Sequence, residues 1–376
     1  MEIYMSENKS NERYQVINFK AKSLENNSIN SPVERKLAIY LPPDYFKTDK
    51  KFPVVYFIHG YTGNIDNLSI TPRWNDNKNL PLDLIPPDVL KMFDLENIPS
   101  YVKFDELITE GEWIPFIFVQ PDASLYLPHY LGHKEISGAL KTKGSFYINS
   151  PYTGNFSDFI IKDVIEYIET NYRAIPNREH RALIGPSMGG YGTLYLYFNY
   201  PSKFNSAVAL SPANMTIDLL NHKMITPINE VLYGKQEAIE LGRVAIQDIT
   251  DTFDMITSRD YPILPSVKQD EIGDIIYMNE NAVKNWQNYD LVNIIKKNVL
   301  NNSKAFNTIN LMLNCHRKDE YGFADQTRKI HDTLLELGID HQFEIYKDYR
   351  AKLAPHMLGI AYKILPAIKF SIQFFN

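Results

Sequence analysis

Cysteine is almost absent from this chain, which has a single one, Cys315, among 376 residues. One cysteine cannot form a disulfide within the chain or supply a zinc site built on several thiolates. The N-terminal segment also lacks the basic start and apolar stretch of a secretory signal. We therefore expect a cytoplasmic protein whose fold is held by packing alone.

A membrane-spanning run is missing as well. The longest apolar segment, 353–375, is interrupted by prolines, a histidine and two lysines, so it falls short of the roughly 18 apolar residues that a spanning helix needs. Lys and Arg total 39 against 45 Asp and Glu, which leaves a net charge of −6 and no block of one sign. These features argue against a membrane or a nucleic acid as a partner.

The residues that are present alternate between two kinds of pattern. Apolar residues make up 44% and charged residues 22% of the chain, as in ordinary globular proteins. Short runs rich in β-branched and aromatic residues predict buried strands at 53–58, 114–119, 181–184, 308–313 and 342–346. Helical spacing predicts helices at 159–172, 188–200, 324–337 and 357–375. This alternation predicts an α/β fold with a mostly parallel central sheet.

The strongest local motif is Gly185-Pro186-Ser187-Met188-Gly189, between a predicted strand and a predicted helix. This is G-x-S-x-G, in which a sharp strand-to-helix turn raises the serine hydroxyl and the glycines let neighbouring backbone pass closely. The motif predicts Ser187 as a nucleophile. It also puts the amide of Met188 at a helix N-terminus, where it can donate to an oxyanion.

A second oxyanion donor is expected after the strand at 53–58, which runs into His59-Gly60-Tyr61. In α/β-hydrolases the loop after the third strand supplies this donor, and we assign it to the amide of Tyr61. The alternative is a plain glycine turn that closes a strand.

An activated serine needs a histidine base, oriented by an acid that precedes it in the chain. Of the histidines after Ser187, His356 alone is expected in the loop between the last strand and the last helix. The acid is expected in the loop after 308–313, where Asp319 is our choice, with Glu320 and Asp325 as rivals. Asp325 fits better as a residue of the next helix's first turn.

These residues resemble a known family, the esterase branch of the α/β-hydrolases that includes feruloyl esterases, S-formylglutathione hydrolases and mycolyltransferases. The matching segments are 54–63, 104–124, 144–175 and 181–213, together with the C-terminal Asp and His loops. The resemblance implies the α/β-hydrolase fold, no cofactor, and a Ser187, Asp319 and His356 triad. It further implies a small-molecule ester as substrate, of a short-acyl or feruloyl type.

Two other functions stay open from sequence. An acyltransferase would use the same triad but pass the acyl group to an alcohol or sugar, and a catalytically dead hydrolase scaffold would serve as a binding module. A metal site is not expected: His129 and His133 have i, i+4 spacing, but Pro128 and Gly132 indicate a loop there.

Two long segments, about 64–100 and 213–285, interrupt the α/β pattern. Both leave the sheet at the end where the turn with Ser187 is expected, so we expect one domain, 1–376, in which they form a cap or lid over the site. The alternative is an interface for a homo-oligomer. Trp286, just after the second segment, is expected to be buried rather than to contact substrate.

Overall fold

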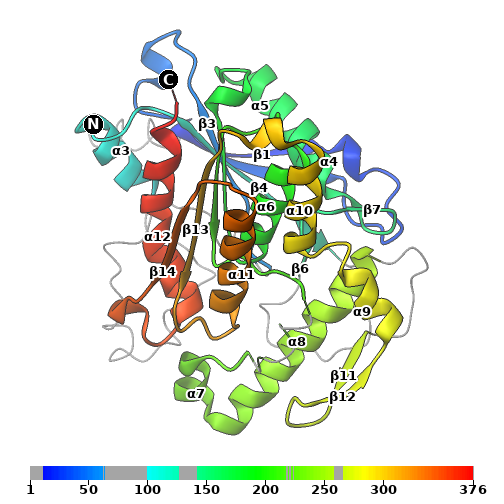
Figure 1. Ribbon diagram of the computed structural model, residues 1–376. Helices are drawn as coiled ribbons and strands as arrows, with labels where there is room; N and C mark the ends of the chain where they lie inside the picture. Colours follow the sequence, from blue (N-terminus) through cyan, green and yellow to red (C-terminus); the bar gives the residue numbers. More distant parts are fainter. Residues whose placement is uncertain are drawn as a thin grey trace.

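The computed structural model describes residues 12–61, 63, 100–126, 142–216, 219, 222, 224–257 and 266–375. Its centre is an eight-stranded sheet with strand order β1-β2-β4-β3-β9-β10-β13-β14 (Figure 1). β2 is antiparallel to both β1 and β4, and the other neighbours are parallel. The mostly parallel α/β sheet predicted from sequence is therefore confirmed. The strands are β1 Tyr14–Lys20, β2 Glu34–Tyr40, β3 Val54–Phe57, β4 Ile117–Pro121, β9 Arg181–Pro186, β10 Ser206–Leu210, β13 Asn310–His316 and β14 Gln342–Tyr346.

Strands β3, β4, β9 and β10 are buried along their whole length, which explains why they appear as continuous apolar runs rather than alternating ones. Several boundaries differ from the expectation, and the strand expected at 114–119 lies at Ile117–Pro121. The strand expected at 308–313 lies at Asn310–His316, because pairing with β10 and β14 continues through Asn314 to His316. The continuous run of apolar residues ends at Leu313, but the backbone hydrogen bonds with β14 continue to His316.

Helices cover both faces of the sheet. Figure 1 shows α12 and α3 on one side and α5, α6 and α10 on the other. β10 contributes to both layers, since Ala207 and Ala209 belong to one apolar cluster and Val208 and Leu210 to the other. The helices are α3 Tyr101–Thr109, α4 Phe156–Asp158, α5 Ile165–Asn171, α6 Met188–Asn199, α10 Leu291–Asn301, α11 Phe323–Glu336 and α12 Pro355–Ile372.

The helix expected at 159–172 is not a single regular one. A π-helical segment, Phe159–Val164, joins α4 to α5. In its wider turn the three consecutive residues Phe159, Ile160 and Ile161 are all buried. Short elements complete the frame: β5 Ser124–Tyr126, β6 Thr142–Gly144, β7 Asn149–Ser150, β8 Gly154–Asn155, and the 3-10 turns Lys22–Leu24, Tyr45–Lys47, Arg178–His180, Ser303–Phe306 and Tyr349–Ala351.

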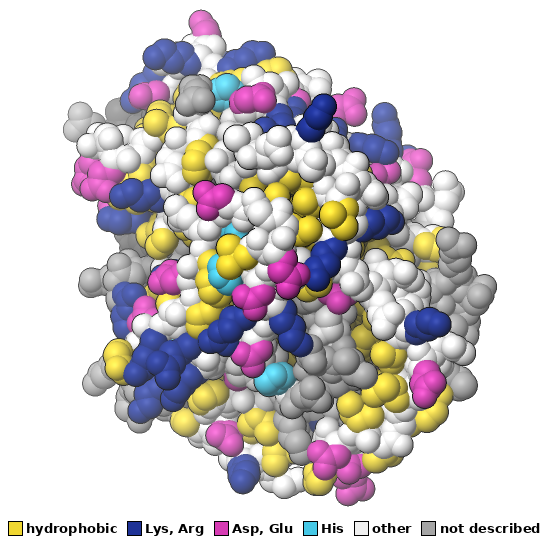
Figure 2. Space-filling view, in the orientation of Figure 1, with side chains coloured by type: hydrophobic (Ala, Val, Ile, Leu, Met, Phe, Trp, Pro, Cys, Tyr) yellow, Lys and Arg dark blue, Asp and Glu magenta, His cyan; other side chains and the backbone are white. Residues whose placement is uncertain are grey.

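The second insertion follows β10 and forms α7 Pro227–Tyr233, α8 Lys235–Thr257, a hairpin of β11 Val267–Gln269 and β12 Ile275–Met278, and α9 Glu280–Trp286. In Figure 1 these elements lie together beyond one end of the sheet. Hydrophobic side chains gather on the surface there (Figure 2), and Ile276 of the hairpin is 68% exposed. Trp286 is buried, as expected. The first insertion, except Ser100, lies outside the described residues.

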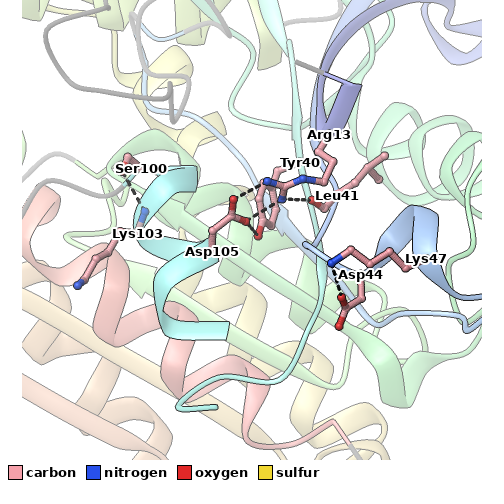
Figure 3. A network of polar contacts seen from close by, with 8 residues as sticks. All are labelled: Arg13, Tyr40, Leu41, Asp44, Lys47, Ser100, Lys103 and Asp105. Atoms are coloured by element: carbon pink, nitrogen blue, oxygen red, sulfur yellow. Dashed lines mark hydrogen bonds and ion pairs between the residues drawn. The ribbon is translucent and has the colours of Figure 1, made fainter. Parts of the chain in front are cut away.

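A polar network joins α3 to the start of β1 and the end of β2. Figure 3 shows Arg13 and Tyr40 directed at the Asp105 carboxylate. Arg13 makes two hydrogen bonds to it, of 2.8 and 2.6 Å, and the Tyr40 hydroxyl donates to it at 2.7 Å. Ser100 caps α3 by accepting from the Lys103 N–H. Within the described residues, no helix has the length and apolarity to cross a bilayer.

Candidate active site

Ser187 lies at the turn between β9 and α6 in a conformation that L-residues rarely adopt, with φ 55° and ψ −120°. Its neighbours hold it there: its N–H donates to the Leu210 carbonyl at 2.8 Å, and its carbonyl accepts from Tyr191 and Ala213. Strain of this kind persists only where the surrounding structure determines it, and it is common at reactive sites. The serine side chain is half-buried.

The two glycines of the motif leave room for backbone, not for side chains. A Cβ at Gly189 would lie 2.1 Å from the Ile58 carbonyl oxygen, and one at Gly185 would lie 2.2 Å from the carbonyl oxygen of Gly189. No rotamer change could relieve either contact. Met188 is the first residue of α6, so its N–H is one of the four that a helix leaves without an internal partner.

The loop after β3 lies beside the serine, since a Cβ at Gly60 would be 3.6 Å from the Ser187 Cβ. His59 anchors this loop. Its Nδ1–H donates to the Gly60 carbonyl at 2.8 Å, and its Nε2 accepts from the Ala123 N–H at 3.0 Å. Burial lowers the pKa of His59, so the ring stays neutral in the tautomer that these contacts require.

Residues 143–147 pack against both residues that carry the candidate oxyanion donors, Tyr61 and Met188. The sequence did not indicate this role. A Cβ at Gly144 would meet the Met188 sulfur and the Tyr61 ring. The Phe146 N–H points at the Met188 sulfur at 3.4 Å, and the Tyr147 hydroxyl donates to the His59 carbonyl at 2.8 Å. Most of these residues belong to the segment 144–175 that resembles the esterase family. Their contacts with Tyr61, His59 and Met188, however, join parts of the chain that are far apart in the sequence.

The predicted base and acid are in contact. His356 Nδ1 and Asp319 Oδ2 are 2.6 Å apart, and both residues are buried. Asp319 also accepts from the Tyr321 N–H at 3.1 Å. The rings of Tyr321 and Phe323 pack against the imidazole, with centroids 4.7 and 5.2 Å away.

The position of His356 corrects one expectation. It lies in the first turn of α12 rather than in a loop. The helix was expected to begin at residue 357, but it begins at Pro355, whose fixed φ suits the first helical position. Since β9, β13 and β14 run parallel, the segments carrying Ser187, Asp319 and His356 all follow carboxyl ends at the same edge of the sheet.

Glu320 contacts His356 through a different atom. Its Oε2 accepts from the backbone N–H of His356 at 2.8 Å, and burial raises the pKa of this carboxyl to about 7. Burial alone would lower the pKa of His356, but the charges of Asp319 and Glu320 outweigh it and raise that pKa. The third rival, Asp325, is paired with Arg328 on the surface of α11.

Three of the other histidines after Ser187 have local partners. The ring of His316 lies against the backbone N–H groups of Lys318 and Asp348, and His331 contacts His341 at 2.8 Å. No three His, Cys, Asp or Glu side chains in the described ranges gather closely enough to hold a metal ion. His129 and His133 lie outside those ranges.

Comparison with known proteins finds similarity to esterases. Residues 137–304 match the family described as "Putative esterase". Esterases of two Mycobacterium tuberculosis strains are 29% identical over 185 residues, which make up 48% of this chain and 30% of theirs. The chain thus corresponds to under a third of the length of these relatives.

Solved structures share the fold at low identity. A ferulic acid esterase superimposes with a TM-score of 0.56 at 17% identity, covering 97% of this chain and 99% of its own. An S-formylglutathione hydrolase from Staphylococcus aureus gives 0.51 at 16% identity, covering 96% and 98%. The chain therefore shares the fold of these structures, and its residues 137–304 match the "Putative esterase" family.

Proposed function

We propose that this protein is a serine carboxylic ester hydrolase that works through an acyl-enzyme intermediate. The observation that carries the proposal is the 2.6 Å contact of His356 Nδ1 with Asp319, at the sheet edge where Ser187 occupies its strained turn. A carboxylate at Nδ1 holds the proton on that nitrogen and leaves Nε2 free to act as a base. The match of residues 137–304 to an esterase family supports the same chemistry.

The first half-reaction follows from these roles. Nε2 of His356 takes the proton of the Ser187 hydroxyl as Oγ attacks the ester carbonyl, and Asp319 stabilises the imidazolium that results. The amides of Tyr61 and Met188 donate to the oxyanion. The intermediate then collapses, and His356 returns the proton to the departing alcohol.

The second half-reaction repeats these steps with water. His356 removes a proton from water, the hydroxide attacks the acyl-serine, and the carboxylic acid leaves as Ser187 regains its proton. For the substrate we propose short-acyl or feruloyl-type esters. The names of two fold neighbours, a ferulic acid esterase and an S-formylglutathione hydrolase, support this choice.

Replacing the nucleophile tests the proposal directly. Ser187→Ala should remove essentially all turnover of p-nitrophenyl acetate and butyrate, and it should abolish covalent labelling by a fluorophosphonate probe. Circular dichroism should show an unchanged fold. Turnover by the variant at near the wild-type rate would refute the assignment. A panel that adds methyl ferulate to acyl esters of increasing length would then define the substrate class.

A further inference from the structure

Helix α8 of the second insertion contacts the candidate oxyanion loop at the Tyr61 side chain. The Tyr61 oxygen lies 2.9 Å from Asp248 Oδ2 and 2.7 Å from the Thr252 hydroxyl oxygen. A phenol has one proton to give, so it donates to the carboxylate and accepts from the threonine hydroxyl. Two residues one turn apart on α8 thus hold the end of the Tyr61 side chain.

The same carboxylate binds the segment behind the loop. Lys143 forms an ion pair with Asp248, and the two side chains are only 5% and 6% exposed. Lys143 adjoins Gly144, which packs against both the Tyr61 ring and the Met188 sulfur. Asp248 is therefore a buried carboxylate shared by the insertion, the oxyanion loop and its support.

Apolar contacts keep α8 in this place. Phe253 packs edge-on against Phe146, with centroids 5.0 Å apart, and Phe146 in turn lies 5.8 Å from the Tyr61 ring. On its other side Phe253 packs against Trp286, whose indole N–H donates to Asp254 at 3.0 Å. Burial of these rings makes α8 a fixed part of the structure around the loop.

We propose that Asp248 is a positioning residue for the oxyanion hole, and this rests on the proposed hydrolase function. A donor on a loop must be held to about half an ångström to stabilise a developing charge. The backbone N–H of Tyr61 is the expected donor. The ring of Tyr61 packs against Gly144, and its hydroxyl donates to Asp248. Through that side chain, α8 fixes the backbone of the loop.

Two single variants and their double test the coupling. Tyr61→Phe keeps the backbone N–H and leaves the Lys143 pair intact, whereas Asp248→Asn weakens both contacts. Loss of a whole oxyanion donor costs about 10²- to 10³-fold in kcat, so a displaced donor should cost roughly tenfold, with KM within about twofold. Because both variants act through one contact, the double variant should be little worse than Asp248→Asn alone.

A tetrahedral inhibitor separates positioning from substrate contact. An alkyl boronic acid bonds to the serine and presents an oxygen to the oxyanion hole, so both variants should bind it more weakly by about the factor lost in kcat. Glu240→Gln is the control on the same helix, since the Glu240 side chain is 44% exposed and pairs with Arg243 one turn away. We expect it to leave kcat, KM and inhibitor affinity unchanged.

The outcomes separate this inference from the proposed function. If fluorophosphonate still labels Ser187 but Tyr61→Phe has wild-type kcat and inhibitor affinity, the positioning role is wrong and the hydrolase proposal stands. If Tyr61→Phe raises KM alone, the hydroxyl contacts substrate, which also overturns the positioning role. If Ser187→Ala retains turnover, the hydrolase proposal itself fails. Because Tyr61→Phe removes no buried charge, misfolding of Asp248→Asn would not prevent a decision.

Discussion

Asp319 and Glu320 are adjacent carboxylates that contact different atoms of His356. Asp319 meets the ring at Nδ1, whereas Glu320 accepts from the backbone N–H in the first turn of α12. Only the first contact can set the tautomer of the imidazole. The second acts on the helix that carries it, as a carboxylate at a helix N-terminus.

Asp319→Asn should therefore lower kcat by about 10⁴-fold, because the amide favours the wrong tautomer of His356, as in serine proteases. Glu320→Gln should cost little, since the amide oxygen can still accept from the His356 N–H. Steady-state kinetics on p-nitrophenyl butyrate measure both. A larger loss in Glu320→Gln than in Asp319→Asn would mean that the two carboxylates have exchanged roles.

The pH profile gives an independent test of the base. Activity requires neutral His356, so the rate should rise with pH, and the raised pKa moves this limb above the ordinary value of about 6.5. Glu320 contributes to that shift through its charge, so Glu320→Gln should move the limb to lower pH. A flat profile between about pH 5 and 8 would contradict the assignment of His356 as base, whereas a limb that does not move in Glu320→Gln would contradict the contribution of the Glu320 charge.

At the scale of elements, the serine turn depends on backbone packed against backbone. Gly189→Ala would drive a Cβ into the Ile58 carbonyl. We expect this overpacking to lower the free energy of unfolding by at least about 1–3 kcal/mol in urea titrations. Gly60→Ala is the matched control, since its Cβ would have only ordinary contacts, at 3.6 Å or more. Equal stability of the two variants would contradict the close backbone packing of the β9–α6 turn.

The Arg13 and Asp105 network joins β1 to α3 away from the serine turn, so it should affect stability without affecting catalysis. Asp105→Asn weakens a charge-assisted pair and the bond from Tyr40. The free energy of unfolding should fall by about 1–3 kcal/mol, with kcat/KM unchanged at 25 °C. A matching loss of kcat/KM in the folded variant would instead show that this edge of the sheet is coupled to the site.

At the scale of the whole molecule, the second insertion and the sheet share one apolar cluster. Phe253, Val267 and Trp286 of the insertion region belong to the same cluster as Leu183 and Leu313 of the central strands. We therefore expect insertion and sheet to unfold together, as the prediction of a single domain requires. Calorimetry should give one transition with equal calorimetric and van't Hoff enthalpies. Two resolved transitions would contradict it.

Features that depend on local chemistry could be predicted from the residues alone. β-branched runs between helical patterns predicted the parallel sheet, because a strand buried on both faces must be apolar throughout. Glycines at 185 and 189 predicted the tight turn, because only glycine allows backbone to approach so closely. Helix boundaries were less certain, since a proline at position 355 can begin a helix as readily as it can lie in a loop.

Contacts between residues far apart in the sequence could not be predicted in this way. The sequence left Asp319, Glu320 and Asp325 as alternatives, and their separate contacts with His356 and Arg328 come from how β13, α11 and α12 pack. Asp248 and Tyr61 are 187 residues apart, and nothing in the local pattern of α8 links them. A hydrogen bond between side chains depends on where the backbone carries each one, and that position is set by the packing of the whole chain.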